Sequence, residues 1–167
     1  FNRTALEDQA VYKQYSNVKV HSKKSSYDKE FRTTISQNFQ KATEIVDLYK
    51  TEDYADNIKN NYALSAEEHY YKVRYDYTDN HFSRIVKITD STHFKNQVDK
   101  IEQYKTYYKG HKLVQNFQLK YYFPRKIQSV SNPLATISAD RKSLSLQLLL
   151  TDCLQNPEIT NLEVVLE

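Results

Sequence analysis

The stretch that decides the fold runs from residue 70 to residue 88 and has the sequence YYKVRYDYTDNHFSRIVKI. Its first half alternates tyrosine or valine with charged residues, which is the two-residue period of a strand with one covered face. Asp79 and Asn80 then occupy the place where a two-residue hairpin turn requires residues that tolerate positive φ. The segment therefore predicts a β-hairpin whose tyrosines on one side face apolar groups.

The same stretch interleaves aromatic and basic side chains, the combination on which a single-stranded nucleic acid stacks. The composition favours another use of the rings, because the chain has 15 Tyr but no Trp or Met, so tyrosine must fill much of the core. Basic residues are scattered among nearly as many acidic ones, 24 against 21, and the glycine-containing aromatic motif of an RNA-recognition sheet is absent. The preferred interpretation is that tyrosines form the core and rim of a sheet, and nucleic acid is a disfavoured partner.

The bulk composition excludes several classes of protein. A single Gly argues against glycine-rich phosphate loops and dinucleotide-binding turns, which cannot be built without glycine. A single Cys excludes an intrachain disulfide and a cysteine-based zinc cluster. No run of sequence approaches the roughly 20 apolar residues that a membrane span requires.

Outside the hairpin, apolar residues at helical spacing predict helices over residues 4–16 and 26–50, and a third helix that begins after Asp90. The helix at 26–50 is supported by a capping-box pattern of Ser25 and Asp28, followed by apolar residues at steps of three and four. Further strands are expected at residues 17–21, 113–123, 135–138, 143–150 and 161–167.

These elements predict an α+β fold. We expect a single domain over residues 1–167, in which amphipathic helices pack on a largely antiparallel sheet whose strands lie mostly in the C-terminal half. The expected order is a helix-rich part at 1–66, a hairpin and helix at 67–110, and a C-terminal sheet at 111–167.

The sequence offers no group of residues arranged for catalysis. None of the five histidines lies in an HExxH motif or four residues from another histidine. Glu67, Glu68 and His69 are adjacent, so their side chains diverge on a helix or a strand, although an enzyme that uses Glu68 and His69 stays a minor alternative. Cys153 follows Asp152, whereas a reactive thiol needs an electropositive surrounding. We therefore predict a protein that is not an enzyme and has no catalytic, metal or cofactor site.

Two tyrosines are out of phase with the strands that carry them. Tyr70 precedes Tyr71 and Tyr122 follows Tyr121, so each must point to the opposite face from its neighbour. Aromatic side chains and arginine are enriched at protein interfaces. The residues predicted to bind a partner are Tyr70, Tyr107, Tyr122, Arg125 and Lys126.

The C-terminal residues 121–167 carry the pattern FPRKIQSV, followed by ATISADRKS and the closing strand LEVVLE. This part resembles the C-terminal part of exported envelope lipoproteins of unknown function from the Bacteroidetes group. Arg125 and Arg141 stand where those patterns often have Gly. The resemblance implies an extracytoplasmic domain, periplasmic or at the cell surface, that is held at the membrane by a lipidated cysteine upstream of Phe1 rather than by a span.

The leading hypothesis is a non-enzymatic cell-envelope lipoprotein domain that binds another envelope protein, as an accessory subunit of an outer-membrane assembly. One alternative is a carrier of lipid or another hydrophobic ligand, held in an apolar cavity of several hundred Å³ between the helix at 26–50 and the sheet. The third is a single-stranded nucleic-acid binder.

Overall fold

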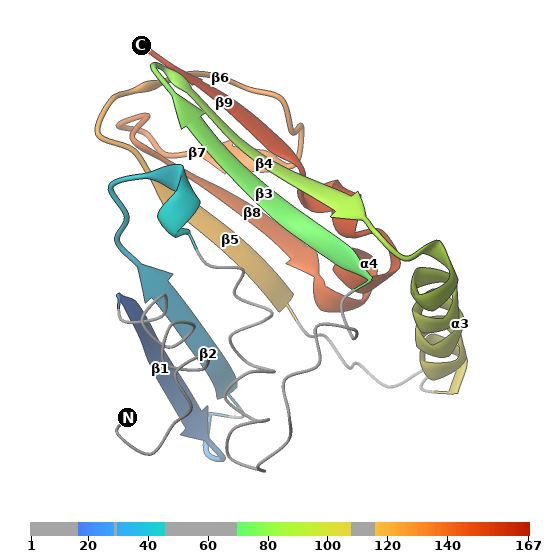
Figure 1. Ribbon diagram of the computed structural model, residues 1–167. Coiled ribbons are helices and arrows are strands. Elements are labelled where there is room, and N and C mark those ends of the chain that lie inside the picture. Colours follow the sequence, from blue (N-terminus) through green and yellow to red (C-terminus); the bar gives the residue numbers. More distant parts are fainter. Residues whose placement is uncertain (1–16, 29, 46–69, 108–115) are drawn as a thin grey trace, which may run out of the picture. The chain divides into compact units, whose positions relative to one another are not determined.

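The computed structural model describes residues 17–28, 30–45, 70–107 and 116–167 (Figure 1). The chain forms two compact units, Phe1–Leu64 and Ser65–Glu167. The helix predicted at 4–16 and the residues Glu67, Glu68 and His69 lie outside the described residues.

The first unit contains an antiparallel hairpin of β1 (Val18–Ser25) and β2 (Glu30–Gln37), followed by the short 3-10 helix η1 (Ala42–Glu44). The hairpin turn is held by Ser25 and Asp28. The backbone N–H of Asp28 donates to Ser25 Oγ at 3.1 Å, and that hydroxyl donates to the Asp28 carboxylate at 2.8 Å.

The helix predicted at 26–50 is therefore wrong over its described part, which is a turn, a strand and η1. The first apolar residues of this segment, Tyr27, Phe31, Ile35 and Phe39, are four positions apart, and four is a multiple of the two-residue period of a strand. Such residues therefore share one face of a strand as well as one face of a helix. The β-branched run Thr33, Thr34 and Ile35 favours the strand. The hydrogen bond from the Asp28 N–H to Ser25 Oγ is one that a capping box would have, but here it closes a turn.

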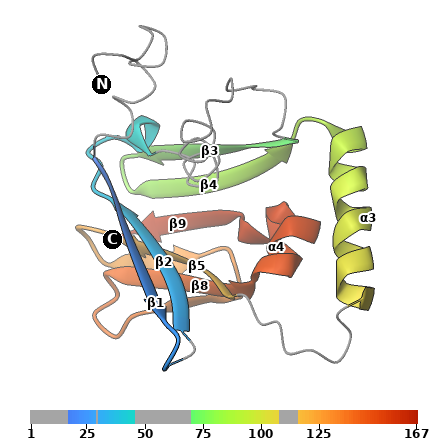
Figure 2. The same ribbon diagram turned by 90° about the horizontal axis from the view of Figure 1, so that it is seen from below.

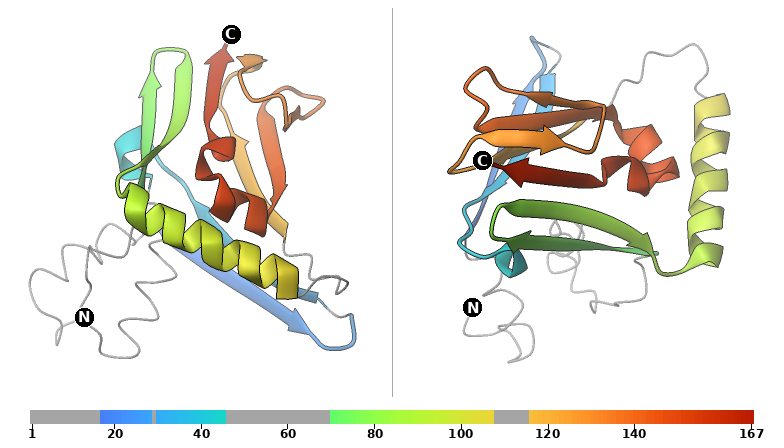
Figure 3. Two further views of the ribbon diagram at one scale, coloured as in Figure 1. Left: turned by 90° about the vertical axis from the view of Figure 1, so that its right-hand side faces the viewer. Right: turned by 90° about the horizontal axis from the view of Figure 1, so that it is seen from above.

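The second unit is built from two antiparallel sheets, which Figure 3 shows from two sides. One has the strand order β3-β4-β9-β6 and the other the order β5-β8-β7. The strands are β3 (Tyr71–Thr78), β4 (His81–Ile88), β5 (Asn116–Tyr122), β6 (Ile127–Val130), β7 (Ala135–Ile137), β8 (Ser143–Leu149) and β9 (Leu162–Leu166). The predicted hairpin at 70–88 is confirmed as β3 and β4, and Asp79 in its turn has a φ of 54°.

Aromatic rings join the two sheets. Phe82 on β4 is fully buried, and its ring centroid lies 5.1 Å from that of Tyr121 and 5.3 Å from that of Phe123, which belong to β5 and its end. The hydroxyl groups of Tyr75 and Tyr121 are 3.5 Å apart. Alternate residues of β8 and β9 complete the core, with Leu144, Leu146, Leu162, Val164 and Leu166 all buried. Tyrosine thus contributes to the core alongside aliphatic residues.

The longest described helix does not cover a sheet. The helix α3 (Ser91–Tyr107) begins after Asp90, whose carboxylate accepts the N–H of His93 at 2.8 Å. It has no buried residue, and it lies beside the six-residue helix α4 (Leu150–Gln155) at one end of the sheets (Figure 2). A second 3-10 helix, η3 (Pro157–Thr160), leads from α4 to β9.

The predicted α+β class is therefore wrong: the described residues are mostly β, in three antiparallel sheets. Strands are not confined to the C-terminal half, since β1 begins at Val18. Amphipathic helices packed on a sheet are absent from the described residues, because α3 contacts α4 and the region expected to form the long helix pairs as a hairpin.

Candidate partner-binding surface

The five residues predicted to bind a partner lie in three places. Tyr70 directly precedes β3 and is half-buried, with its ring centroid 5.6 Å from those of His93 and Phe94 in α3. Burial raises the pKa of its phenol. Tyr107 lies at the other end of α3 and is 80% exposed. Tyr122, Arg125 and Lys126 lie together at the end of β5 and in the connection to β6.

The connection from β5 to β6 is bound to the turn between β7 and β8. The N–H of Phe123 donates to the carbonyl of Lys142 at 2.8 Å, and the N–H of Ile127 donates to the carbonyl of Arg141 at 2.7 Å. Phe123 and Ile127 are buried, whereas the residues between them are exposed. This pairing places two further basic residues next to Arg125 and Lys126. We call Tyr122, Arg125, Lys126, Arg141 and Lys142 the turn-end surface.

The turn between β7 and β8 has a defined backbone. The carboxylate of Asp140 accepts hydrogen bonds from Ser138 Oγ at 2.5 Å and from the N–H of Lys142 at 3.0 Å. These bonds, the one from Ser138 first, hold the pKa of Asp140 below its usual value. Arg141 has a φ of 57°, in the left-handed region that glycine adopts without strain.

The guanidinium groups fix neighbouring segments to this turn. Arg141 donates to the carbonyls of Ile127 and Gln128 and forms an ion pair with Glu167 at 3.2 Å. Arg125 donates to the carbonyl of Asp79 in the β3–β4 turn. In Figure 1 the β3–β4 turn, the β5–β6 connection and the C-terminus accordingly lie at the same end of the sheets. The surface is therefore built on turns that are held by main-chain and guanidinium hydrogen bonds.

Tyr122 supplies an exposed ring at this end. It is 70% exposed, it pairs with Ser143 across the sheet, and it points away from the core face that carries Tyr121. The Lys120 ammonium lies 5.0 Å from the centre of the ring, within cation–π range. Sequence phase correctly placed Tyr122 on the outer face. The sequence did not point to Arg141 and Lys142, because only strand pairing brings their turn next to the β5–β6 connection.

A buried basic side chain, that of Arg84 on β4, lies between the two sheets. Arg84 is 3% exposed and donates to both the carbonyl and the hydroxyl of Thr160, with a distance of 3.0 Å to the carbonyl. Its guanidinium carbon lies 5.9 Å from the centre of the Tyr75 ring.

Two buried groups have raised pKa values. Burial raises the pKa of Tyr121 well above its usual value, Tyr75 raises it further, and Arg84 lowers it. Burial, with Asp152 next, raises the pKa of the Cys153 thiol to about 11. Both groups thus stay protonated at neutral pH, and the Cys153 side chain is buried.

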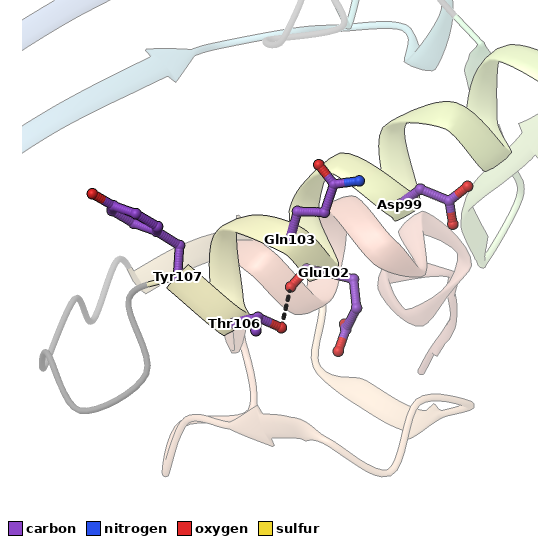
Figure 4. A pocket seen from close by; sticks show the side chains of 5 residues that line it. All are labelled: Asp99, Glu102, Gln103, Thr106 and Tyr107. Atoms are coloured by element: carbon purple, nitrogen blue, oxygen red, sulfur yellow. Dashed lines mark hydrogen bonds between the residues drawn. The ribbon is translucent and has the colours of Figure 1, made fainter.

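The close-up in Figure 4 shows a depression on α3. It is open to solvent, and its lining comes from this one helix: Asp99, Glu102, Gln103, Thr106 and Tyr107. The hydroxyl of Thr106 donates to the carbonyl of Glu102 at 2.9 Å. This depression is not the enclosed apolar cavity that a carrier needs, and the helix expected to wall that cavity is not formed over residues 30–45.

Over the described residues, no group of three or more His, Cys, Asp or Glu side chains is placed to hold a metal ion. Nor does that part of the chain contain a helix long and apolar enough to cross a membrane. Comparisons with models of known protein families, with curated proteins and with solved structures found no match for this chain.

Proposed function

We propose that this chain is a non-enzymatic cell-envelope domain that binds another protein through the turn-end surface, as an accessory subunit of a membrane assembly. The observation that supports binding is the exposed ring of Tyr122 at the end of β5, with the Lys120 ammonium 5.0 Å from its centre. The exposed residues Arg125 and Lys126 follow it, and main-chain hydrogen bonds join this segment to Arg141 and Lys142. The envelope location is supported by the resemblance of residues 121–167 to exported lipoproteins.

The chemistry of this surface suits a protein partner. Tyr and Arg are the residue types that most often carry binding energy at interfaces, and they do so when water is excluded around them. The turns that hold them are already ordered, through the bonds of Phe123 and Ile127 to the β7–β8 turn, so binding loses little conformational entropy. The cations favour a partner surface that presents carboxylates around an apolar site for the Tyr122 ring.

Co-purification from native membranes under mild detergent tests the proposal. The variant carries Tyr122→Ala, Arg125→Ala and Lys126→Ala. A matched control removes one exposed tyrosine and two lysines from α3, as Tyr107→Ala, Lys95→Ala and Lys100→Ala. Truncation of a residue that dominates an interface costs about 2 kcal/mol or more, roughly 30-fold in affinity.

We expect the partner recovered with the unmodified chain to be lost with the first variant and retained with the control. Equal recovery with both variants, or a chain that purifies alone from its native membranes, would contradict the proposal.

A further inference from the structure

The β1–β2 hairpin concentrates positive charge. Residues 18–37 contain five Lys or Arg and two Asp or Glu, a balance of +3 that equals the net charge of the whole chain. Residues directly opposite each other in a hairpin share a face, and so do alternate residues of a strand. The register pairs Lys23 with Arg32, His21 with Thr34, and Lys19 with Ser36. These six side chains are all exposed, so one face of the hairpin combines cations with hydroxyl groups.

An aromatic ring projects from the tip of the same hairpin. Tyr27 is 96% exposed, more than any other large apolar residue of the described chain. The hydrogen bonds between Ser25 and Asp28 on either side of it fix the turn that presents it. Lys23 and Lys24 precede the turn, and both are exposed. The tip therefore presents a phenol ring with cations directly behind it.

This arrangement distinguishes between anionic partners. A single-stranded nucleic acid requires several rings along its path on which successive bases stack. None of the six residues of this basic face is Tyr, Phe or Trp: they are Lys19, His21, Lys23, Arg32, Thr34 and Ser36. One tyrosine at a tip, followed by lysines, instead matches the interface of a membrane, where phenol rings lie at the level of the headgroups and cations reach the phosphates.

We infer that the tip of the β1–β2 hairpin docks on an anionic lipid surface, with Tyr27 at the headgroup level and Lys23, Lys24 and Arg32 against lipid phosphates. The inference goes beyond the proposed function and is independent of the turn-end surface. Docking supplies the chain with a membrane contact of its own and orients it on the bilayer. Each Lys or Arg near an anionic leaflet strengthens binding about fivefold.

Co-sedimentation of the full chain with lipid vesicles measures this binding. The vesicles are pure phosphatidylcholine, or equal parts of phosphatidylcholine and phosphatidylglycerol. We expect sedimentation with the anionic vesicles only. Raising the salt from about 0.1 M to about 1 M shortens the screening length from about 10 Å to about 3 Å and should release the protein.

The variant Lys23→Ala with Lys24→Ala should weaken binding about 25-fold, given about fivefold for each cation. The matched control, Lys72→Ala with Lys87→Ala, removes two exposed lysines that lie opposite each other in the β3–β4 hairpin, and it should bind as the unmodified chain does. Circular dichroism of each variant confirms that its strands are formed.

The absence of Trp from the chain permits a reporter at the tip. In the variant Tyr27→Trp, the fluorescence should shift to the blue with anionic vesicles and be quenched by lipids brominated on their acyl chains. The variant Tyr107→Trp, at the exposed end of α3, should show neither effect.

Equal binding to both kinds of vesicle, no binding to either, or equal losses in the two lysine variants would overturn the inference. So would tighter binding to a single-stranded or duplex oligonucleotide than to the anionic vesicles, because the hairpin would then be a nucleic-acid site.

Discussion

Phe82→Ala tests whether aromatic rings hold the two sheets of the second unit together. Phe82 is 0% exposed and is surrounded by the rings of Tyr75, Tyr77, Tyr121 and Phe123, with centroids 5.1 to 6.5 Å away. Truncation of a buried Phe to Ala usually costs about 3–5 kcal/mol, which combines lost transfer free energy with the cavity left behind. A domain has only about 5–15 kcal/mol of stability in total. The variant should therefore lose a fifth or more of it.

Urea unfolding, followed by circular dichroism, measures this loss as a lower midpoint at an unchanged slope. The variant Phe82→Leu keeps much of the apolar volume but loses the ring contacts, so its urea midpoint should lie between those of the unmodified chain and Phe82→Ala. The matched control is Tyr122→Ala, because this ring lies on the outer face of β5, and its loss should change the free energy of unfolding by less than about 0.5 kcal/mol. A cost below about 1 kcal/mol for Phe82→Ala, or an equal cost for Tyr122→Ala, would refute the reasoning.

Three further predictions concern the turn-end surface and the buried thiol. Replacing Arg141, at a φ of 57°, by Val should destabilise the protein by about 1–2 kcal/mol relative to Arg141→Gly, because a β-branched residue fits the left-handed region poorly. Both variants lack the guanidinium, so a difference between their urea midpoints reports on the backbone alone. Equal midpoints would argue against a left-handed conformation at residue 141. The pKa of Asp140 is lower in the folded chain than in the unfolded one, so its contribution to stability is present above the unfolded pKa and is lost as the pH falls through the folded pKa. Carboxyl chemical shifts during an acid titration should place the midpoint of Asp140 below that of an ordinary Asp. An ordinary midpoint would mean that the hydrogen bonds to Asp140 are not formed. With a pKa of about 11 and a buried side chain, Cys153 should resist alkylation by iodoacetamide at pH 8 in the native protein and react fully in urea, whereas rapid native reaction would mean an exposed, acidic thiol.

The fold could be predicted from sequence where only one period fits the pattern. Strict alternation and a turn at Asp79 and Asn80 identify β3 and β4, and the alternating Leu162, Val164 and Leu166 identify β9. The segment at 27–39 was ambiguous because steps of four satisfy both a helix and a strand, and the wrong choice there led to the wrong fold class. The helix α4 spans only six residues, too few to show a helical period.

Only the part of the turn-end surface that depends on local strand phase could be predicted from the sequence. The phase of Tyr122 relative to Tyr121 is a local property of one strand, so it placed the ring correctly on the outer face. The approach of Arg141 to the β5–β6 connection depends on the pairing of β5 with β8, which the sequence of either strand does not specify. Tyr107, although exposed, lies on α3 and not on the turn-end surface.

Photo-crosslinking in native membranes tests most directly the claim that the chain binds a protein through the turn-end surface. A photo-reactive phenylalanine analogue replaces Tyr122 in one chain and Tyr107 in another, since both positions are exposed. We expect one defined protein adduct from position 122, lost on adding Arg125→Ala and Lys126→Ala, and none from position 107. Adducts of the same pattern from both positions, or no protein adduct from position 122, would contradict it.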